Sequence, residues 1–339
     1  NREFVMEKNP QFDSDTVPGV PVANVEQITA KIVPNLSQQT QDVIDNRLDY
    51  IMDPPAADLK AEVIERFGPD GSENQRFEEF ATLSTYFFFM NERTEPFDDQ
   101  KVREAVNIGI DKPALARLFA GELAPGCSFL PPDMPGYTEE IDLSGCPWGN
   151  PNEAPNLERA KRLLREAGAE GAEVTVWGNS DDPTPKVTQA YADQLNQIGF
   201  DAEPKIINGA VYFQTIGNQE TEAQTGFLNW FADFPHPLNF FFLLDGDTIQ
   251  PTNNQNISNT DDPRINEELD ELRGESDLTA VTDRWEGLND HAVESAYLAP
   301  YGHTKLTAFV SDRIDFEECV VVHPLYYVDF SRFCLKSGE

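Results

Sequence analysis

Basic side chains are scarce in this sequence. Its 339 residues include 25 Lys and Arg against 60 Asp and Glu, which gives a formal net charge of −35 at pH 7. A surface of this charge repels phosphate groups, so general binding to nucleic acids is excluded. Long apolar runs are missing as well: no stretch of about 18 or more apolar residues occurs, and we expect no membrane-spanning helix.

Motifs for catalysis and metal binding are also missing. The four histidines form no His-x-x-x-His or His-Glu-x-x-His pair, and the sequence has no Gly-x-Ser-x-Gly, P-loop or Gly-x-Gly-x-x-Gly motif. We therefore expect no catalytic residues, no metal site and no cofactor, and we do not expect an enzyme.

Apolar residues are abundant enough for a folded protein. They make up 39% of the chain and include 23 Phe, so the acidity does not indicate a disordered chain. A single hydrophobic core rarely grows beyond about 250–300 residues, and the length therefore predicts roughly two domains.

The four cysteines form two pairs that are close in sequence, Cys127 with Cys146 and Cys319 with Cys334. Neither pair is a Cys-x-x-Cys motif, which argues against zinc-ribbon and thioredoxin-like sites. The even count in local pairs favours two disulfides and an oxidising compartment. Four reduced, buried thiols in a cytosolic protein remain the alternative on this evidence.

Apolar periodicity and capping residues predict the secondary structure. Strands are expected at 25–33, 82–90, 173–177 and 201–207 and again after residue 299. Helices are expected at 38–46, 58–67, 100–110, 111–119, 157–167 and 185–198, and over most of 264–298. Ser37 and Asn156 are the expected caps of the helices that follow them. The strand, helix and strand over 173–207 predict a crossover, and with it an α/β fold.

Several segments, in this order, resemble the solute-binding proteins of the peptide, oligopeptide and nickel class of ABC transporters (family 5). They are EKNP at 7–10, RLD at 47–49, TYFFFMN at 85–91, PFDD at 96–99, VREAV at 102–106, GIDK at 109–112, NLERAK at 156–161, LLREAG at 163–168 and NWFADF at 229–234, followed by Pro237. One departure is Asn46, where this family usually has glycine.

The resemblance implies a type II periplasmic-binding-protein fold with two lobes joined by a hinge. Residues 1–82 would be the remnant of lobe one, residues 83–299 would form lobe two, and residues 300–339 would return to lobe one. Most of lobe one would then be missing at the N-terminus, together with any signal peptide or lipid anchor. The family works outside the cytoplasmic membrane, in the periplasm or at the cell surface, where disulfides persist.

Asp233 is the first candidate ligand-binding residue. In peptide-binding relatives, the aspartate at the matching position pairs with the α-ammonium group of the ligand. The neighbouring aromatic residues suggest an enclosed carboxylate, and an enclosed charge needs a partner. The competing structural role is an aspartate that caps a turn before Pro235.

Five further residues are expected near the ligand. Trp230 and Phe231 would supply flat apolar contacts and Asn229 would supply hydrogen bonds. Tyr86 and Ser84 lie on one face of the expected strand 82–90 because strand side chains alternate between faces. Plain packing in a buried core would account equally well for the aromatic and strand residues.

The span 206–263 contains no Lys or Arg, although it includes the expected ligand segment. A free ligand carboxylate would find no basic partner there. The composition therefore favours a cationic or neutral ligand, such as a peptide bound through its backbone, an amine or an oligosaccharide.

The sequence predicts the substrate-binding component of an ABC importer, which captures a peptide-like solute by hinge closure. Its expected partners are a small-molecule or peptide ligand and the membrane permease subunits, with no nucleic acid, and the protein is expected to be a monomer. The alternatives are the same class of receptor for an oligosaccharide or another amine or neutral solute, an extracellular hydrolase, and a structural or adhesive surface module.

Overall fold

The computed structural model describes residues 3–16, 22–33, 35–323 and 327–336. The chain forms two compact units, unit 1 with residues 1–80 and 305–339, and unit 2 with residues 81–304. The crossing points differ from those expected at 82/83 and 299/300. At the second crossing the reason is a continuous strand, β10 (Leu298–Val310), whose first residues pair within unit 2 up to Thr304. The assignment of these units to lobes remains a prediction.

Unit 1 consists of short elements around two small cores. Its strands and helices are β1 (Glu3–Glu7), β2 (Gln27–Lys31), α1 (Leu36–Ile44), β3 (Tyr50–Ile51), α2 (Lys60–Phe67), β4 (Phe77–Ala81), α11 (Phe316–Cys319), β11 (Val322–His323) and β12 (Tyr327–Val328). Phe309 on β10 packs with residues of α1 and α2 in one core, while Phe316 and Phe333 belong to the other.

The cap of α1 differs from the expected one. Asn35 accepts a hydrogen bond from the backbone N–H of Gln38 at 2.9 Å, whereas the hydroxyl of Ser37 donates to Asp58. The helix begins at Leu36, two residues before the expected start at residue 38, so Asn35 and not Ser37 occupies the capping position. After the helix, Asn46 adopts φ 59°, a left-handed conformation that asparagine tolerates better than most residues and that glycine adopts readily.

The β1–β2 pair leaves apolar side chains in contact with solvent. All five residues of β1 are exposed, among them Phe4 at 53%, Val5 at 49% and Met6 at 41%. A two-stranded sheet is marginally stable by itself in water.

Unit 2 holds the remaining elements. They are β5 (Ser84–Met90), α3 (Gln100–Gly109), α4 (Lys112–Arg117), β6 (Leu123–Pro125), η1 (Glu139–Asp142), α5 (Leu157–Glu166), β7 (Glu173–Asn179), α6 (Thr184–Ile198), β8 (Asp201–Ile207), α7 (Gly209–Ile216), η2 (Gln219–Thr221), β9 (Thr225–Phe231), α8 (Leu238–Phe241), η3 (Gly246–Thr248), α9 (Pro263–Leu272), η4 (Leu278–Val281) and α10 (Thr282–Glu294), followed by β10. The strands β6 and β9 and the helices α7 and α8 were not expected from the sequence, and neither was β4 of unit 1.

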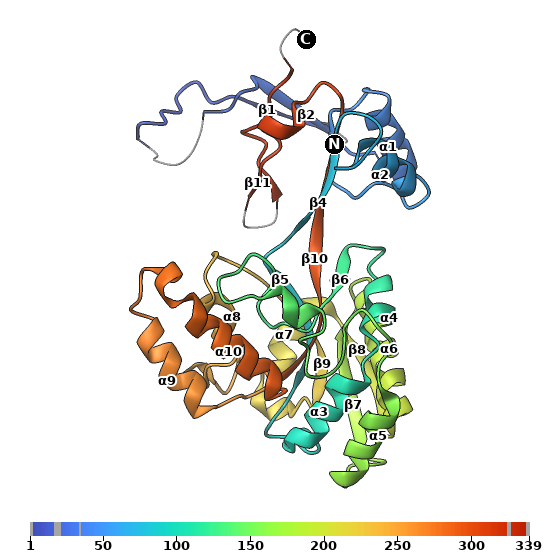
Figure 1. Cartoon of the computed structure of the whole chain (residues 1–339), viewed down its shortest axis with the longest axis vertical. Helices are drawn as coiled ribbons and strands as arrows, with labels where there is room; N and C mark the ends of the chain where they lie inside the picture. Colours follow the sequence, from blue (N-terminus) through green and yellow to red (C-terminus); the bar gives the residue numbers. More distant parts are fainter. Residues whose placement is uncertain (1–2, 17–21, 34, 324–326, 337–339) are drawn as a thin grey trace. The chain divides into compact units, whose positions relative to one another are not determined.

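The sheet of unit 2 is mixed, with strand order β10-β5-β9-β7-β8. Strand β7 runs parallel to β8 and β9, whereas β5 runs antiparallel to β9 and β10. The helix α6 connects β7 to β8, which confirms the expected crossover. Helices α3, α5 and α6 pack against one another, and α6 packs against β7 and β8, as labelled in Figure 1. Unit 2 therefore has the α/β fold that the sequence predicts.

Aromatic side chains of β5 form the centre of unit 2. Phe87, Phe88 and Phe89 are fully buried. The ring of Phe88 stacks between Tyr191 of α6 and Tyr301 of β10, with centroid distances of 3.6 and 4.7 Å. This packing holds β5 firmly between its two neighbouring strands.

Both expected disulfides are present, Cys127–Cys146 in unit 2 and Cys319–Cys334 in unit 1. The structure therefore supports two local disulfides and not four reduced thiols. In the described part of the chain, no helix is long and apolar enough to cross a bilayer.

Candidate functional site

Four of the expected ligand residues share one face of two paired strands. In the β5–β9 register, Ser84 lies opposite Phe231 and Tyr86 lies opposite Asn229. Residues that face each other across an antiparallel pair point to the same side of the sheet. The structure thus brings together side chains that are far apart in sequence.

Tyr86 and Ser84 differ in their surroundings. The half-buried ring of Tyr86 makes edge contacts with Phe119, Phe227 and Phe231. Burial raises the pKa of the Tyr86 phenol, and a hydrogen bond with Asn229 partly offsets this.

The hydroxyl of Ser84 is fully buried in a cluster with the hydroxyls of Thr82 and Thr304. It hydrogen-bonds within the protein, so a buried structural role describes Ser84 in this structure.

Trp230 lies on the opposite face of the sheet from Asn229 and Phe231. Its indole N–H donates to Asn239 Oδ1 at 2.9 Å, and its ring packs edge-on against Phe242 at 5.0 Å. The side chain is half-buried. Trp230 and Phe231 therefore cannot form one aromatic wall, because adjacent strand residues point in opposite directions.

Asp233 follows β9 in a surface loop, and its side chain is exposed. The enclosed environment expected from its aromatic neighbours is not observed, because Phe234 beside it is itself 48% exposed. Because Asp233 is exposed, its carboxylate does not need a partner within the protein. It remains accessible to a cation from solution.

Asn239, at the start of α8, was not identified from the sequence and organises this loop. Its Oδ1 accepts the backbone N–H of Asp233 and the indole N–H of Trp230, both at 2.9 Å. Both partners can only donate, which fixes the orientation of the amide. Its Nδ2 therefore faces Asp233 Oδ2, at 3.4 Å.

We expect Asn239→Leu to lower the free energy of unfolding by about 1–3 kcal/mol, because Asn239 is 4% exposed and two N–H donors lose their acceptor. Denaturant unfolding followed by tryptophan fluorescence measures both the loss and the changed environment of Trp230. The matched variant Asn239→Asp keeps the acceptor but places a second carboxylate beside Asp233, and it should retain more of the stability. Equal stability of Asn239→Leu and the natural chain would contradict this role.

A surface pocket of about 300 Å³, called the side pocket below, adjoins this loop through Trp230. Its lining residues are Phe213, Gln214, Leu228, Asn229, Trp230, Leu243, Asn253, Asn254, Gln255 and Ile257. All of them belong to unit 2 and to the span without Lys or Arg.

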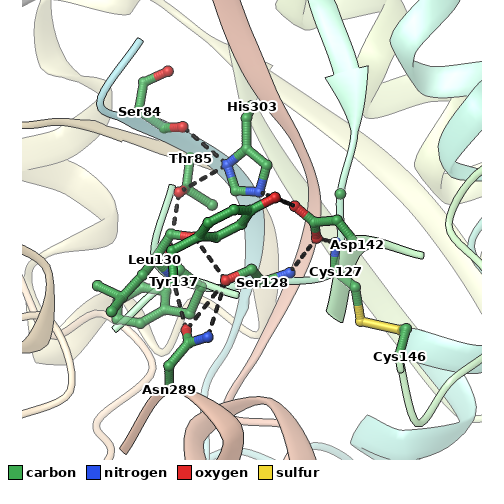
Figure 2. A network of polar contacts seen from close by, with 12 residues as sticks. Ser84, Thr85, Cys127, Ser128, Leu130, Tyr137, Asp142, Cys146, Asn289 and His303 are labelled. Atoms are coloured by element: carbon green, nitrogen blue, oxygen red, sulfur yellow. Dashed lines mark hydrogen bonds and ion pairs between the residues drawn. A yellow bond between two sulfur atoms is a disulfide. The ribbon is translucent and has the colours of Figure 1, made fainter. Parts of the chain in front are cut away.

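A second feature of unit 2, a buried network around Asp142 and His303, is shown in Figure 2. Asp142 Oδ1 accepts the backbone N–H groups of Cys127 and Ser128 at 2.5 and 2.8 Å. Its Oδ2 accepts the hydroxyl of Tyr137 at 3.1 Å and lies 3.2 Å from His303 Nε2. Nε2 is not oriented for an aligned hydrogen bond, so charge makes the larger contribution to this contact.

The other nitrogen of His303 also faces acceptors. Nδ1 lies 3.1 Å from the carbonyl oxygen of Ser84 and 3.3 Å from Thr85 Oγ1, whose own proton is donated to the carbonyl of Phe129. Nδ1 can therefore donate to these acceptors, while Nε2 faces the carboxylate of Asp142. The side chain of His303 is 2% exposed.

The pKa of Asp142 reflects its contact with His303. Burial raises its pKa, but the charge of His303 and the hydrogen bonds from the backbone N–H groups of Cys127 and Ser128 outweigh burial and lower the pKa to about 2. Nearby, burial lowers the pKa of Lys112 to about 8 against the opposing charge of Asp142. Lys112 donates to the carbonyl of Gly126 at 3.1 Å.

Asn289 of α10 holds the adjacent segment in the same network. Its Oδ1 accepts the backbone N–H of Leu130 at 2.9 Å, and its Nδ2 donates to Ser128 Oγ at 3.0 Å. The loop closed by Cys127–Cys146 is therefore fixed to α10 and to β10. Nothing in the sequence distinguished Asp142 from the other carboxylates.

No group of three or more His, Cys, Asp or Glu side chains in the described ranges is arranged to hold a metal ion. The chemistry available at the loop of Asp233 is recognition by charge and hydrogen bonds beside an apolar pocket.

The fold is that of solute-binding proteins. The chain is similar to HbpA2 from Haemophilus parasuis, with a TM-score of 0.78 and 20% identity over 99% of this chain and 62% of that one. It is also similar to the ABC transporter-associated periplasmic binding protein DppA from Helicobacter pylori in complex with the peptide STSA, with a TM-score of 0.69 and 18% identity over 99% of this chain and 61% of that one. These similarities confirm the expected type II periplasmic-binding-protein fold.

The chain belongs to the bacterial extracellular solute-binding proteins, family 5, whose model matches residues 1–251. It is 31% identical over 152 residues to the glutathione-binding protein GsiB of Escherichia coli K12, a match that covers 43% of this chain and 28% of that protein. The chain thus matches well under half the length of this curated relative and about three fifths of the solved ones. The relatives are named as binding proteins, and the family expected from the sequence is confirmed.

Proposed function

We propose that this chain is the substrate-binding part of an ABC importer and that it binds a peptide-like solute through the solute's amino group at Asp233. The observation that carries the proposal is the exposed carboxylate of Asp233, which Asn239 holds at the end of β9 in a chain of family 5. Relatives named for binding peptides and glutathione support this class of ligand.

The charge of the surrounding sequence favours an ammonium group over a carboxylate. The span 206–263 has no Lys or Arg, and the whole chain carries a net charge of −35. A surface of one sign raises the local concentration of ligands of the opposite sign. A charged hydrogen bond between a carboxylate and an ammonium is also stronger than a neutral one.

The mechanism would be closure of two lobes about a hinge, with ligand contacts stabilising the closed state. The closed form would then be recognised by the permease subunits outside the cytoplasmic membrane. No covalent step is required, so the chain would act as a monomeric receptor without catalysis.

We expect Asp233→Asn to weaken binding of the tripeptide Ala-Leu-Ala by roughly 10- to 150-fold, because a charged hydrogen bond contributes about 1.5–3 kcal/mol. The substitution keeps the shape of the side chain and removes only its charge. Titration calorimetry of the natural chain and the variant measures the effect.

The matched control is Glu220→Gln, which removes an exposed carboxylate from the same span without Lys or Arg and should leave the affinity within about twofold. The N-acetylated tripeptide should bind the natural chain as weakly as the free tripeptide binds Asp233→Asn. Equal affinity of Asp233→Asn and the natural chain would remove Asp233 from the site. Tight binding of a neutral oligosaccharide in place of the peptides would favour the alternative ligand.

A further inference from the structure

The side pocket has an apolar floor and a polar rim. Leu228, Leu243 and Ile257 form the floor, and their exposed fractions are 5%, 3% and 6%. The rings of Trp230 and Phe213 stand at its walls, and Phe213 is 48% exposed. A concave apolar site with a few polar groups is typical of small-molecule recognition.

All polar lining residues are uncharged. Five of the lining residues are amides, namely Gln214, Asn229, Asn253, Asn254 and Gln255, although the side chain of Asn229 lies on the other face of the sheet with Tyr86. None of the ten lining residues is Asp, Glu, Lys, Arg or His. A quarter of the whole chain is charged, so this lining differs from the remaining surface. A charged group placed here would lose water without gaining a partner, which is unfavourable.

The loop on one side of the pocket is held in place from within. Asn254 is 3% exposed, and its Nδ2 donates to the carbonyl of Asn256 at 2.6 Å while its backbone N–H donates to Gly217 at 2.9 Å. Asn253 next to it adopts φ 53°, a left-handed conformation that asparagine tolerates. This loop of the pocket is therefore fixed by hydrogen bonds within the protein.

One amide connects the pocket to the candidate ligand carboxylate. Trp230 lines the pocket, and its indole N–H shares Asn239 Oδ1 with the backbone N–H of Asp233. The wall of the pocket and the backbone of Asp233 are thus fixed to the same atom. A ligand whose ammonium group meets Asp233 has the pocket close by.

We propose that the side pocket selects an uncharged side chain with a large apolar body in a ligand whose amino group is bound by Asp233. The inference rests on the proposed function and adds the ligand's side-chain class to it. Leucine, methionine and phenylalanine side chains match the apolar floor, and a glutamine side chain can extend its amide to the rim. Lysine and glutamate side chains would be rejected.

The test uses two series of tripeptides, X-Ala-Ala and Ala-X-Ala, in which X is Ala, Leu, Gln, Lys or Glu. Their dissociation constants for the natural chain are measured by calorimetry, and tryptophan fluorescence reports contact with Trp230. In one of the two series, Leu should bind at least about tenfold more tightly than Ala, and Lys and Glu at least about tenfold more weakly than Leu.

Two pairs of matched variants locate the effect. Gln255→Glu adds a charge to the pocket rim with almost no change of shape, and Gln250→Glu makes the same change at an exposed residue of the same loop outside the lining. Gln255→Glu should reduce the preference for Leu over Lys at least about fivefold, and Gln250→Glu should leave it unchanged. Phe213→Ala should weaken the Leu peptide more than Val211→Ala, an exposed apolar residue of the same helix outside the lining.

The outcomes separate the two proposals. If the tripeptides bind in a manner that depends on Asp233 but affinity does not vary with X, or if the two variants of each pair behave alike, the side pocket has no role in selection and this inference is overturned. If no tripeptide binds, or if Asp233→Asn has no effect on binding, the proposed function falls and this inference falls with it.

Discussion

Asp142→Ala is expected to lower the free energy of unfolding by about 3–5 kcal/mol, the range found when one partner of a buried ion pair is removed. The variant leaves the imidazole of His303 without its carboxylate and the backbone N–H groups of Cys127 and Ser128 without an acceptor. Asp142 is 8% exposed, so water replaces these contacts poorly. Chemical denaturation near pH 7 measures the loss.

The same pair predicts a dependence on pH with a defined sign. The folded-state pKa of Asp142 is lowered to about 2, from about 3.9 in an unfolded chain. A carboxylate with a lowered folded-state pKa adds stability above the unfolded pKa and loses it as the pH falls toward the folded one. The stability contributed by Asp142 should therefore disappear between about pH 4 and pH 2, and its size is about 2 kcal/mol.

Asp142→Asn isolates this effect from the titration of the other carboxylates. It keeps an oxygen that can accept from Cys127 and Ser128 and removes the charge beside His303. The difference in unfolding free energy between the natural chain and this variant should shrink as the pH falls from 4 to 2. Glu139→Gln, at an exposed carboxylate of the same short helix, is the control and should show no such trend. A constant difference for Asp142→Asn across this range would refute the charge pairing.

Removal of the Cys127–Cys146 disulfide through Cys127→Ala and Cys146→Ala is expected to lower the free energy of unfolding by about 3 kcal/mol. The two cysteines are separated by 19 residues, and closing a loop of this length restricts the unfolded chain by roughly that amount. The loop contains Asp142, and Cys127 donates its backbone N–H to that carboxylate. Loss of the disulfide should therefore also weaken the pairing with His303.

A double-mutant cycle separates these two contributions. Neighbouring sites that share a network are coupled, so the losses from the disulfide and from Asp142→Asn should not add. The second disulfide, Cys319–Cys334, closes a loop of similar length in unit 1 and serves as the matched control. The loss in free energy of unfolding from its removal should simply add to the loss from Asp142→Asn. If the loss in free energy of unfolding from removing either disulfide simply adds to the loss from Asp142→Asn, the Cys127–Cys146 disulfide does not help to position Asp142.

Local structure was predictable because its signals lie within short stretches of sequence. The apolar run in Thr82–Met90 predicts the buried strand β5, and Asn156 caps α5 as expected. Gly199, with φ 118°, ends α6 before the parallel strand β8. Helix α7 was not predicted, because its start is set by the Asn208 cap and the sequence before it shows no apolar pattern typical of a helix.

The candidate site was predictable only in part. Tyr86 and Asn229 lie opposite each other, as two residues near one site should, but Trp230 faces the other side of the sheet. Asp233 was expected to be enclosed by aromatic rings and is exposed, because Phe234 points away from the core and into solvent. Asn239 was not identified from the sequence, because an asparagine near a proline is typical of an ordinary loop.

By itself the sequence determined the acidity, and it indicated the α/β class, the two local disulfides and the family, because composition and short motifs carry this information. Only the tertiary structure decided that Asp142, one of 60 acidic residues, meets His303, and that one amide joins Asp233 to Trp230. It also brought uncharged residues from α7, β9 and the loop at 253–257 around one pocket. Such contacts join segments that are distant along the chain, and the energy that selects them comes from burial and pairing, which no single stretch of sequence contains.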